Sequence, residues 1–123
     1  MFELKVTDHF AAAHQLRMVA EKCENLHGHN WKVEAYFAGK QLNKAGVLVD
    51  FGQLKNHLSE IMNTLDHKYL NELDFLAGGN PSSENIAYYI ATKLQDCLTG
   101  EAIYVSRVAV WESENACATY MPE

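Results

Sequence analysis

The sequence lacks the features that mark membrane, secreted and nucleic-acid-binding proteins. No apolar run is long enough to span a bilayer, and no charged segment followed by an apolar one opens the chain, so we expect a cytoplasmic protein. The 10 basic residues are scattered and the net charge is −6, which argues against a nucleic-acid-binding face. Three cysteines at irregular spacing do not make a disulfide framework.

What the chain does have is enough apolar material for one core. It is 123 residues long and 48% hydrophobic, so we expect a single domain over residues 1–123. A domain of this size buries only a modest fraction of its surface, and contacts between copies would stabilise it. We therefore expect a homo-oligomer.

The spacing of apolar residues changes along the chain from period 2 to a helical period and back. It predicts the following elements: a strand over 2–14, a strand over 27–38, a helix from Phe51 to Leu65, a second helix between Ser82 and Gly100, and strands over 102–111 and 115–121. Asp50 and Gln53 have the spacing of a capping box, and Ser82 is a helix N-cap residue. The order ββααββ indicates an α+β fold, with two helices on one face of a four-stranded antiparallel sheet.

Three histidines form the sharpest local feature. His27 and His29 are two residues apart on a predicted strand, so both imidazoles point the same way. His14 ends the preceding strand and is the best candidate for a third ligand. Three neutral imidazoles suit Zn²⁺ and leave a coordination position open. A His-x-His pair alone is more often an ordinary surface or core pair, but the small residues before His14 are consistent with a neighbouring cavity.

Four other residues are candidates for acid–base chemistry or substrate binding. Cys23 lies four residues before His27, and nearby positive charge would favour its thiolate. Asp66 and His67 follow the first predicted helix, where the carboxylate could orient the imidazole. Glu112 ends an apolar strand and needs a partner there. The alternatives are a buried thiol, a histidine at a helix C-terminus and a solvated strand-end charge.

The two remaining cysteines have a simpler interpretation. Cys97 continues the apolar stripe of the second predicted helix, and Cys117 lies in the last predicted strand. Both are expected to be small, buried apolar residues without a role in chemistry.

Taken together, these motifs resemble the 6-pyruvoyl-tetrahydropterin synthase / 6-carboxy-5,6,7,8-tetrahydropterin synthase family, nearly from end to end. The resemblance rests on five strings: Phe10-x-Ala-Ala-His14; Cys23-x-x-x-His27-Gly28-His29-Asn30-Trp31; Val49-Asp50-Phe51; Leu65-Asp66-His67-Lys68-x-Leu70-Asn71; and Pro81-Ser82-Ser83-Glu84-Asn85-Ile86-Ala87 with the later Trp111-Glu112. It implies the tunnelling fold (T-fold), in which subunits join their sheets into a trimeric barrel and two trimers form a hexamer.

The resemblance also implies a role for each candidate. His14, His27 and His29 match the zinc ligands, Cys23 the catalytic base, and Asp66 with His67 its proton-relay partners. Glu112 matches a residue that anchors the pterin ring, and Ser82 and Ser83 match pterin contacts supplied to a neighbouring subunit. The substrate implied is 7,8-dihydroneopterin triphosphate, with Zn²⁺ as the only cofactor.

Members of the family differ in their product. The compact length resembles the bacterial type, which makes 6-carboxy-5,6,7,8-tetrahydropterin for queuosine and other 7-deazapurines and releases acetaldehyde and triphosphate. The animal type makes 6-pyruvoyl-tetrahydropterin. Glu24 directly follows Cys23, as in members that also make 6-hydroxymethyl-7,8-dihydropterin for folate; the alternative is a solvated loop charge. Two rival classes are a zinc-dependent hydrolase and a non-catalytic pterin-binding protein.

Overall fold

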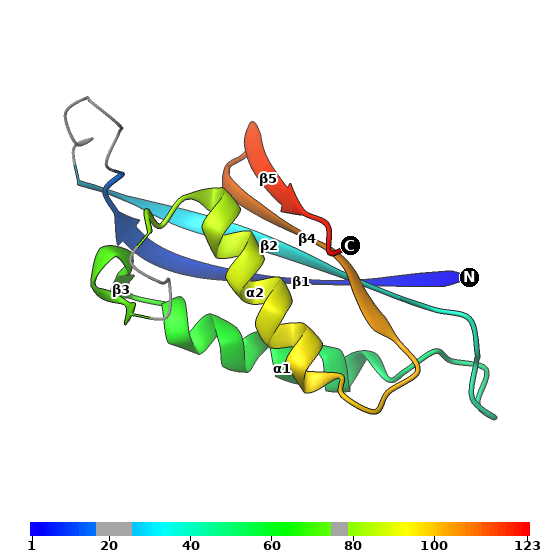
Figure 1. Ribbon diagram of the computed structural model, residues 1–123. Coiled ribbons are helices and arrows are strands. Elements are labelled where there is room, and N and C mark those ends of the chain that lie inside the picture. The colour runs from blue at the N-terminus through cyan, green and yellow to red at the C-terminus, as the bar shows by residue number, and fades with distance from the viewer. Residues whose placement is uncertain (17–25, 75–78) are drawn as a thin grey trace.

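The chain folds as one sheet covered by two helices. The computed structural model describes residues 1–16, 26–74 and 79–123. Its elements are β1 (Phe2–His14), β2 (His27–Gly39), α1 (Phe51–Leu65), β3 (Lys68–Tyr69), the 3-10 helix η1 (Leu70–Glu72), α2 (Ser83–Cys97), β4 (Tyr104–Ser113) and β5 (Ala116–Tyr120). The strand order is β3-β1-β2-β4-β5, and Figure 1 shows the arrangement. The α+β class expected from the sequence is confirmed.

The sheet has five strands rather than the four predicted, because a short strand follows α1. β3 pairs in parallel with β1, through Ala12 with Lys68 and Ala13 with Tyr69. All other neighbouring strands are antiparallel. Two residues are too few to show an alternating pattern, so β3 has no signature in the sequence.

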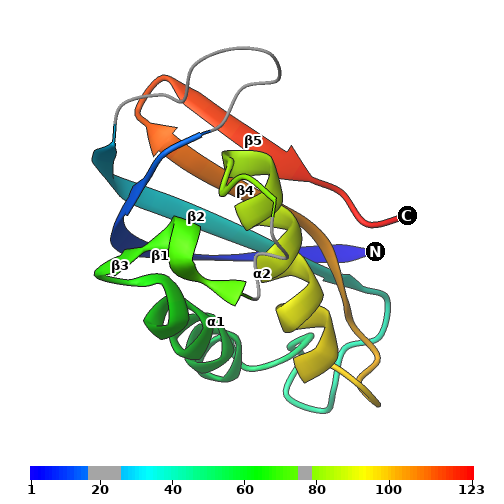
Figure 2. The same ribbon diagram turned by 60° about the vertical axis from the view of Figure 1, so that its left-hand side comes forward.

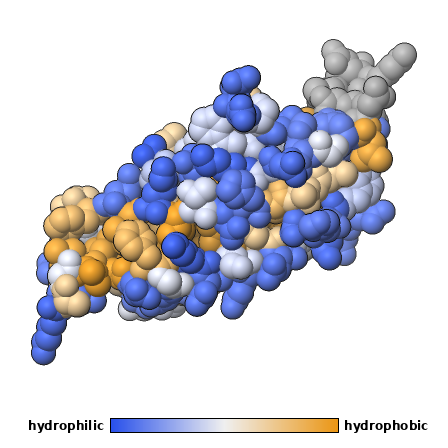
Figure 3. Space-filling view, turned by 180° about the vertical axis from the view of Figure 1, so that it is seen from behind, coloured by the Kyte–Doolittle hydropathy of each residue, from blue (hydrophilic) through white to orange (hydrophobic). Residues whose placement is uncertain are grey.

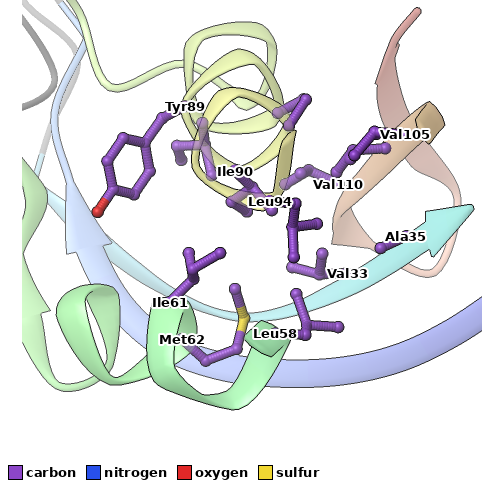
Figure 4. Close-up of a cluster of buried hydrophobic side chains, with 14 of the residues drawn as sticks. Val33, Ala35, Leu58, Ile61, Met62, Tyr89, Ile90, Leu94, Val105 and Val110 are labelled. Carbon is purple, nitrogen blue, oxygen red and sulfur yellow. The ribbon is translucent and has the colours of Figure 1, made fainter. Parts of the chain in front are cut away.

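Both helices lie on the same face of the sheet (Figures 1 and 2). α1 contacts β1, while α2 contacts β4 and β5. Apolar side chains from the helices meet those of β2 and β4 between the layers (Figure 4). The largest fully buried apolar side chains are Trp31, Phe37, Leu54, Leu58, Leu65, Leu70, Ile86, Ile90, Leu94 and Leu98. Each contributes about 1.5–3 kcal/mol by leaving water, which makes this layer the main source of stability.

The helix boundaries follow local capping chemistry. The Ser82 hydroxyl accepts a hydrogen bond from the Asn85 amide at 3.1 Å and starts α2 as predicted. Asp50 is the N-cap of α1, but its side chain makes no capping hydrogen bond, so the predicted capping box with Gln53 is not formed. Gly100 has a φ of 85°, which glycine adopts without strain, just after α2 ends.

The face of the sheet away from the helices carries polar and aromatic side chains over β1, β2 and β4. Arg107 lies over Tyr36, with Cζ 3.9 Å from the ring centroid, and forms an ion pair with Glu3 at 3.3 Å. Figure 3 shows the molecule from behind, with an apolar area toward one end. Phe2, at the start of β1, and Phe51 are among the exposed large apolar side chains. Among the described residues, neither helix is long and apolar enough to cross a bilayer.

The pairing of β1 with β2 fixes the side chains that matter most below. The register sets Phe10 opposite Trp31, Ala12 opposite His29 and His14 opposite His27, which is the last pair of the ladder. The rings of Phe10 and Trp31 stack at 5.5 Å. The pairing of the two strands therefore places His14, His27 and His29 together at one end of the sheet.

Candidate metal centre

Four side chains converge at the end of the β1–β2 hairpin. His14, His27, His29 and Glu112 each offer one ligand atom, and these atoms all lie within 4.8 Å of one another. The Nε2 atoms of His14 and His27 are 2.9 Å apart. Nε2 of His29 lies 3.2 Å from Oε1 of Glu112, and Nε2 of His14 lies 4.0 Å from Oε2. The structure thus brings together the three histidines that the sequence predicts as ligands.

The strand register explains the convergence. His14 and His27 are directly opposite each other, and His29 lies two residues along β2, on the same face of the pleat. The ring centroids of His27 are 4.5 Å from those of both His14 and His29. Trp31 continues this face by another two residues, and its buried ring contacts His14 and His29 edge-on at 5.0 and 5.3 Å. The imidazoles of His14 and His29 therefore pack against the buried indole of Trp31.

His14 is held in one orientation by the backbone. Its side chain is 0% exposed, and Nδ1–H donates a hydrogen bond to the carbonyl oxygen of Pro81 at 2.8 Å. With the proton on Nδ1, the lone pair of Nε2 faces the other histidines, which is the tautomer a metal ligand needs. Pro81 lies just before the N-cap of α2. The sequence does not indicate that Pro81 accepts this hydrogen bond, because every residue has a backbone carbonyl.

Glu112 reaches the cluster from a third strand. It lies in β4 at a β-bulge, where Trp111 pairs with Cys117 of β5 and Ser113 with Ala116, which leaves Glu112 as the extra residue. A bulge re-aims the side chain that it carries. The Ser83 hydroxyl donates to Oε2 of Glu112 at 3.4 Å. The carboxylate that the resemblance matches to an anchor of the pterin ring therefore lies, in this structure, against the histidines.

The donor set fits a zinc ion. Three imidazole nitrogens and a carboxylate oxygen are ligand types that zinc accepts, and four tetrahedral ligands about 2.0–2.1 Å from zinc lie roughly 3.4 Å apart. The nitrogen–nitrogen and nitrogen–oxygen distances of 2.9, 3.2 and 4.0 Å bracket that separation. The side chains could enclose an ion with only small adjustments.

Asp66 and His67 form a second pair, which is not part of the four-residue group. Oδ1 of Asp66 accepts a hydrogen bond from the Ala11 amide at 2.8 Å, and Nδ1–H of His67 donates to Oδ2 of Asp66 at 2.9 Å. The His67 amide in turn donates to the Ala11 carbonyl. The pair is thus bound to the edge of β1, and the imidazole is exposed.

The charge state of Asp66 follows from these contacts. The hydrogen bond from the Ala11 amide, followed by those from His67, holds the pKa of the Asp66 carboxyl below its usual value, although partial desolvation opposes the shift. Asp66 is therefore an anion at neutral pH, and it favours the Nδ1–H tautomer of His67. Nε2 is left to accept or donate a proton.

The other predicted site residues divide into three groups. Ser83 contacts Glu112 and belongs to the cluster, whereas the Ser82 hydroxyl is engaged as the N-cap of α2. Cys23 and Glu24 lie outside the described residues. Among the residues that sequence reasoning missed, Trp31 had a signal, because it continues the i, i+2 series of His27 and His29.

Comparisons with known proteins identify the family. Residues 3–123 match the family described as 6-pyruvoyl tetrahydropterin synthase. A Pyrococcus furiosus protein named dihydroneopterin monophosphate aldolase is 34% identical over 103 residues, which cover 84% of this chain and 82% of that one. An Archaeoglobus fulgidus protein named "Putative 6-carboxy-5,6,7,8-tetrahydropterin synthase" is 35% identical over 113 residues, covering 92% and 90%.

The fold is also that of solved structures. The 6-pyruvoyl tetrahydropterin synthase of Caenorhabditis elegans superposes with a TM-score of 0.86 at 24% identity, covering 99% of this chain and 96% of the other. This superposition shows the T-fold that the resemblance implied. The family match spans nearly the whole sequence, and the strands of this chain bring three histidines together. The chain therefore belongs to the 6-pyruvoyl tetrahydropterin synthase family of pterin synthases.

Proposed function

We propose that this protein is a zinc-dependent 6-carboxy-5,6,7,8-tetrahydropterin synthase. It converts 7,8-dihydroneopterin triphosphate to 6-carboxytetrahydropterin and releases acetaldehyde and triphosphate, a step toward queuosine and other 7-deazapurines. The observation that carries the proposal is the group of three imidazoles and one carboxylate on a pterin-synthase fold. The 6-carboxy name borne by the Archaeoglobus fulgidus relative supports this product.

The ion is held by His14, His27 and His29. Bound there, zinc supplies a Lewis acid that makes the side-chain hydroxyls of the substrate and the adjacent C–H more acidic. Glu112, whose Oε1 lies 3.2 Å from Nε2 of His29, anchors the pterin ring, as the resemblance implies for this residue.

Proton transfer is the work of three residues. Cys23 as thiolate removes a proton from the substrate side chain; it is four residues from His27, and four extended residues span at most about 14 Å. His67 exchanges the second proton through Nε2, while Asp66 holds its Nδ1–H at 2.9 Å. Ser82 and Ser83, at the start of α2, contact the pterin, as the resemblance implies for a neighbouring subunit.

The active assembly is a homo-oligomer, a trimer or a dimer of trimers. β5 forms one edge of the sheet, and at the other edge β3 covers β1 only at Ala12 and Ala13. Unpaired strand edges of this kind pair with other chains. Light scattering coupled to size-exclusion chromatography measures the oligomer mass, and a monomer at micromolar concentration would contradict the assembly.

A second product is favoured by one further observation. The Pyrococcus furiosus relative is named an aldolase acting on dihydroneopterin monophosphate, and Glu24 adjoins Cys23 here. We propose that Glu24 lets the same site also release 6-hydroxymethyl-7,8-dihydropterin. A Glu24→Gln variant should lose this product and keep the 6-carboxy product, whereas loss of both would assign Glu24 to the main reaction.

The decisive test is product identification. The zinc-loaded protein is incubated with 7,8-dihydroneopterin triphosphate, and the pterins are separated and identified by mass spectrometry. We expect 6-carboxytetrahydropterin and an equimolar amount of acetaldehyde, with no product from His27→Ala. 6-Pyruvoyl-tetrahydropterin as the sole product would assign the animal-type reaction. Substrate bound but unchanged would indicate a binding protein, and cleavage of simple esters or amides would favour a hydrolase.

A further inference from the structure

The buried indole of Trp31 contacts two of the three histidines directly. Trp31 lies in β2, two residues beyond His29, and is 0% exposed. Its ring centroid is 5.0 Å from that of His14 and 5.3 Å from that of His29, and the ring planes meet at 80° and 79°. Both imidazoles therefore lie nearly perpendicular to the indole, an arrangement that aromatic pairs prefer.

The two imidazoles are also nearly perpendicular to each other. The ring centroids of His14 and His29 are 5.2 Å apart, and their planes meet at 75°. Together with Trp31 they form a compact group of three mutually edge-on rings. In so closely packed a group, turning either imidazole would drive it against the indole. The group therefore restricts the directions in which the ring nitrogens of the two histidines point.

The indole is itself held in place from β1. Nε1–H of Trp31 donates a hydrogen bond to the carbonyl oxygen of Ala12 at 3.4 Å. The ring of Phe10 stacks on the indole with an interplanar angle of 3° and a centroid distance of 5.5 Å. The register of the two strands sets Phe10 opposite Trp31 and Ala12 opposite His29. The indole is thus anchored to the strand that carries His14.

Filling the core does not by itself require an indole at this position. Tryptophan is rarely buried completely because it is large, and its N–H needs a partner when it is buried. The distance of 3.4 Å to the Ala12 carbonyl is long for such a bond, which makes the bond weak. Farther along the same face of β2, Val33, Ala35 and Phe37 are buried without any polar side-chain atom. The contacts to the histidines are what distinguish Trp31 from these residues.

We propose that Trp31 is a positioning residue of the zinc site, which holds the imidazoles of His14 and His29 in the ligand geometry before the ion binds. It acts by direct contact with both rings, and as a buried apolar surface it keeps water from their inner sides. The inference rests on the proposed function, because it takes the three histidines as the zinc ligands.

The size of the expected effect follows from other residues that orient metal ligands. Loss of such a residue typically weakens metal binding by about 10–100-fold. Trp31→Phe keeps an aromatic ring, but the ring is smaller and has no N–H, so we expect zinc binding to weaken about tenfold. Trp31→Leu removes the aromatic ring altogether and should weaken zinc binding about 100-fold.

The experiment measures the zinc dissociation constant by competition with a chelator, in a fixed buffer, for the wild type and the two Trp31 variants. The matched control is Phe37→Leu, which removes another fully buried ring on the same face of β2. Phe37 pairs with Leu4, six residues along the ladder from the Phe10–Trp31 pair. Thermal unfolding of each metal-free variant establishes that it is folded.

Cobalt(II) in place of zinc gives a second measurement. The visible absorption of cobalt depends on the geometry of its ligands and is strongest for a tetrahedral site. We expect weaker absorption in both Trp31 variants, because less restrained imidazoles admit water to the ion. The spectrum of Phe37→Leu should match that of the wild type.

Three results would overturn the inference. One is a folded Trp31 variant that binds zinc as tightly as the wild type. Another is a cobalt spectrum that does not change in such a variant. The third is a loss of zinc affinity in Phe37→Leu as large as in the Trp31 variants, which would assign the effect to general loosening of the core. If Trp31→Leu does not fold, Trp31→Phe, which leaves the smaller void, decides by the same criteria.

Failure of the inference is distinct from failure of the proposed function. If the zinc affinities follow the expected pattern but no pterin product forms, the positioning role stands and the proposed reaction fails. If the product forms and the Trp31 variants bind zinc like the wild type, the reaction stands and the positioning role is wrong.

Discussion

Nδ1 of His14 lies 2.8 Å from the carbonyl oxygen of Pro81, and this hydrogen bond joins the end of β1 to the residue before the N-cap of α2. It gives His14, a proposed metal ligand, a structural role as well. His14 is fully buried, whereas His27 is partly exposed. The two histidines should therefore respond differently to removal of their side chains.

We expect both His14→Ala and His27→Ala to lose zinc, but His14→Ala to destabilise the metal-free protein more than His27→Ala does. His14→Ala leaves the buried Pro81 carbonyl without its donor, which costs about 1–3 kcal/mol. Urea unfolding in the presence of EDTA measures this difference, and zinc content is measured by mass spectrometry of the metal. His57→Ala, outside the cluster, is the control. Equal unfolding free energies for the two variants would contradict the structural role of His14.

The Asp66–His67 pair allows proton transfer to be separated from metal binding. His67 has a φ of 58°, a left-handed conformation that asparagine tolerates better than most residues. His67→Asn should therefore fold and bind zinc normally while kcat falls by about 10²–10⁴-fold, the usual contribution of a general acid or base. A β-branched replacement such as His67→Val should also be strained and less stable.

Asp66→Asn serves as the companion change. The amide oxygen can still accept from the Ala11 amide, but the negative charge beside His67 is lost. Lower kcat with unchanged zinc affinity is the expected result. Wild-type kcat in both Asp66→Asn and His67→Asn would exclude the pair from proton transfer.

The pH dependence of stability should report Glu34, a buried carboxylate of β2. Burial alone would raise the pKa of Glu34, but the hydrogen bonds from Trp111 and Lys5 outweigh it and lower the pKa from 4.5 in the folded state. The charged form therefore stabilises the fold above the unfolded value, and this contribution is lost as pH falls from about 4.5 through the folded value. Glu34→Gln cannot titrate and should lose less unfolding free energy between pH 6 and pH 3 than the wild type. Denaturant unfolding of both proteins across this pH range measures the two losses. Equal losses of unfolding free energy would contradict the lowered pKa of Glu34 in the folded state.

Cys23 remains a prediction from the sequence, and its role can be tested directly. We expect Cys23→Ala to retain zinc and to bind the pterin substrate while losing most turnover, because only the base is removed. Zinc content and substrate binding by calorimetry accompany the rate measurement. Cys97→Ala is the matched control, since this exposed cysteine lies at the end of α2. Full activity of Cys23→Ala would favour a different base.

Elements with a clear apolar period could be predicted from the sequence, and the metal ligands with them. β1 was expected over residues 2–14 and spans Phe2–His14, and His14, His27 and His29 meet as predicted. These results depend on the alternation of side chains along each strand. The pairing of β1 with β2 then brings the three histidines close together. The sequence did not predict that Glu112 lies against these histidines, because the bulge that carries it depends on pairing between β4 and β5.

The two cysteines show where periodicity misleads. Cys97 was expected in the core but is exposed, because Leu98, four residues after Leu94, occupies the buried position instead. Cys117 was also expected to be buried and is exposed on β5, at the edge of the sheet. The spacing i+3 and the spacing i+4 both fit a helical stripe, and only the packing against β4 decides between them.

The position of the histidines at the last rung of the β1–β2 ladder has a dynamic consequence. Strand ends open most readily, so without an ion the amides around His14 and His27 should exchange with deuterium rapidly. An ion shared by both strands would close this end, because opening it would require the metal to dissociate. Deuterium uptake at the hairpin end should then fall on zinc addition, while the Phe2 end of the same hairpin keeps its original rate.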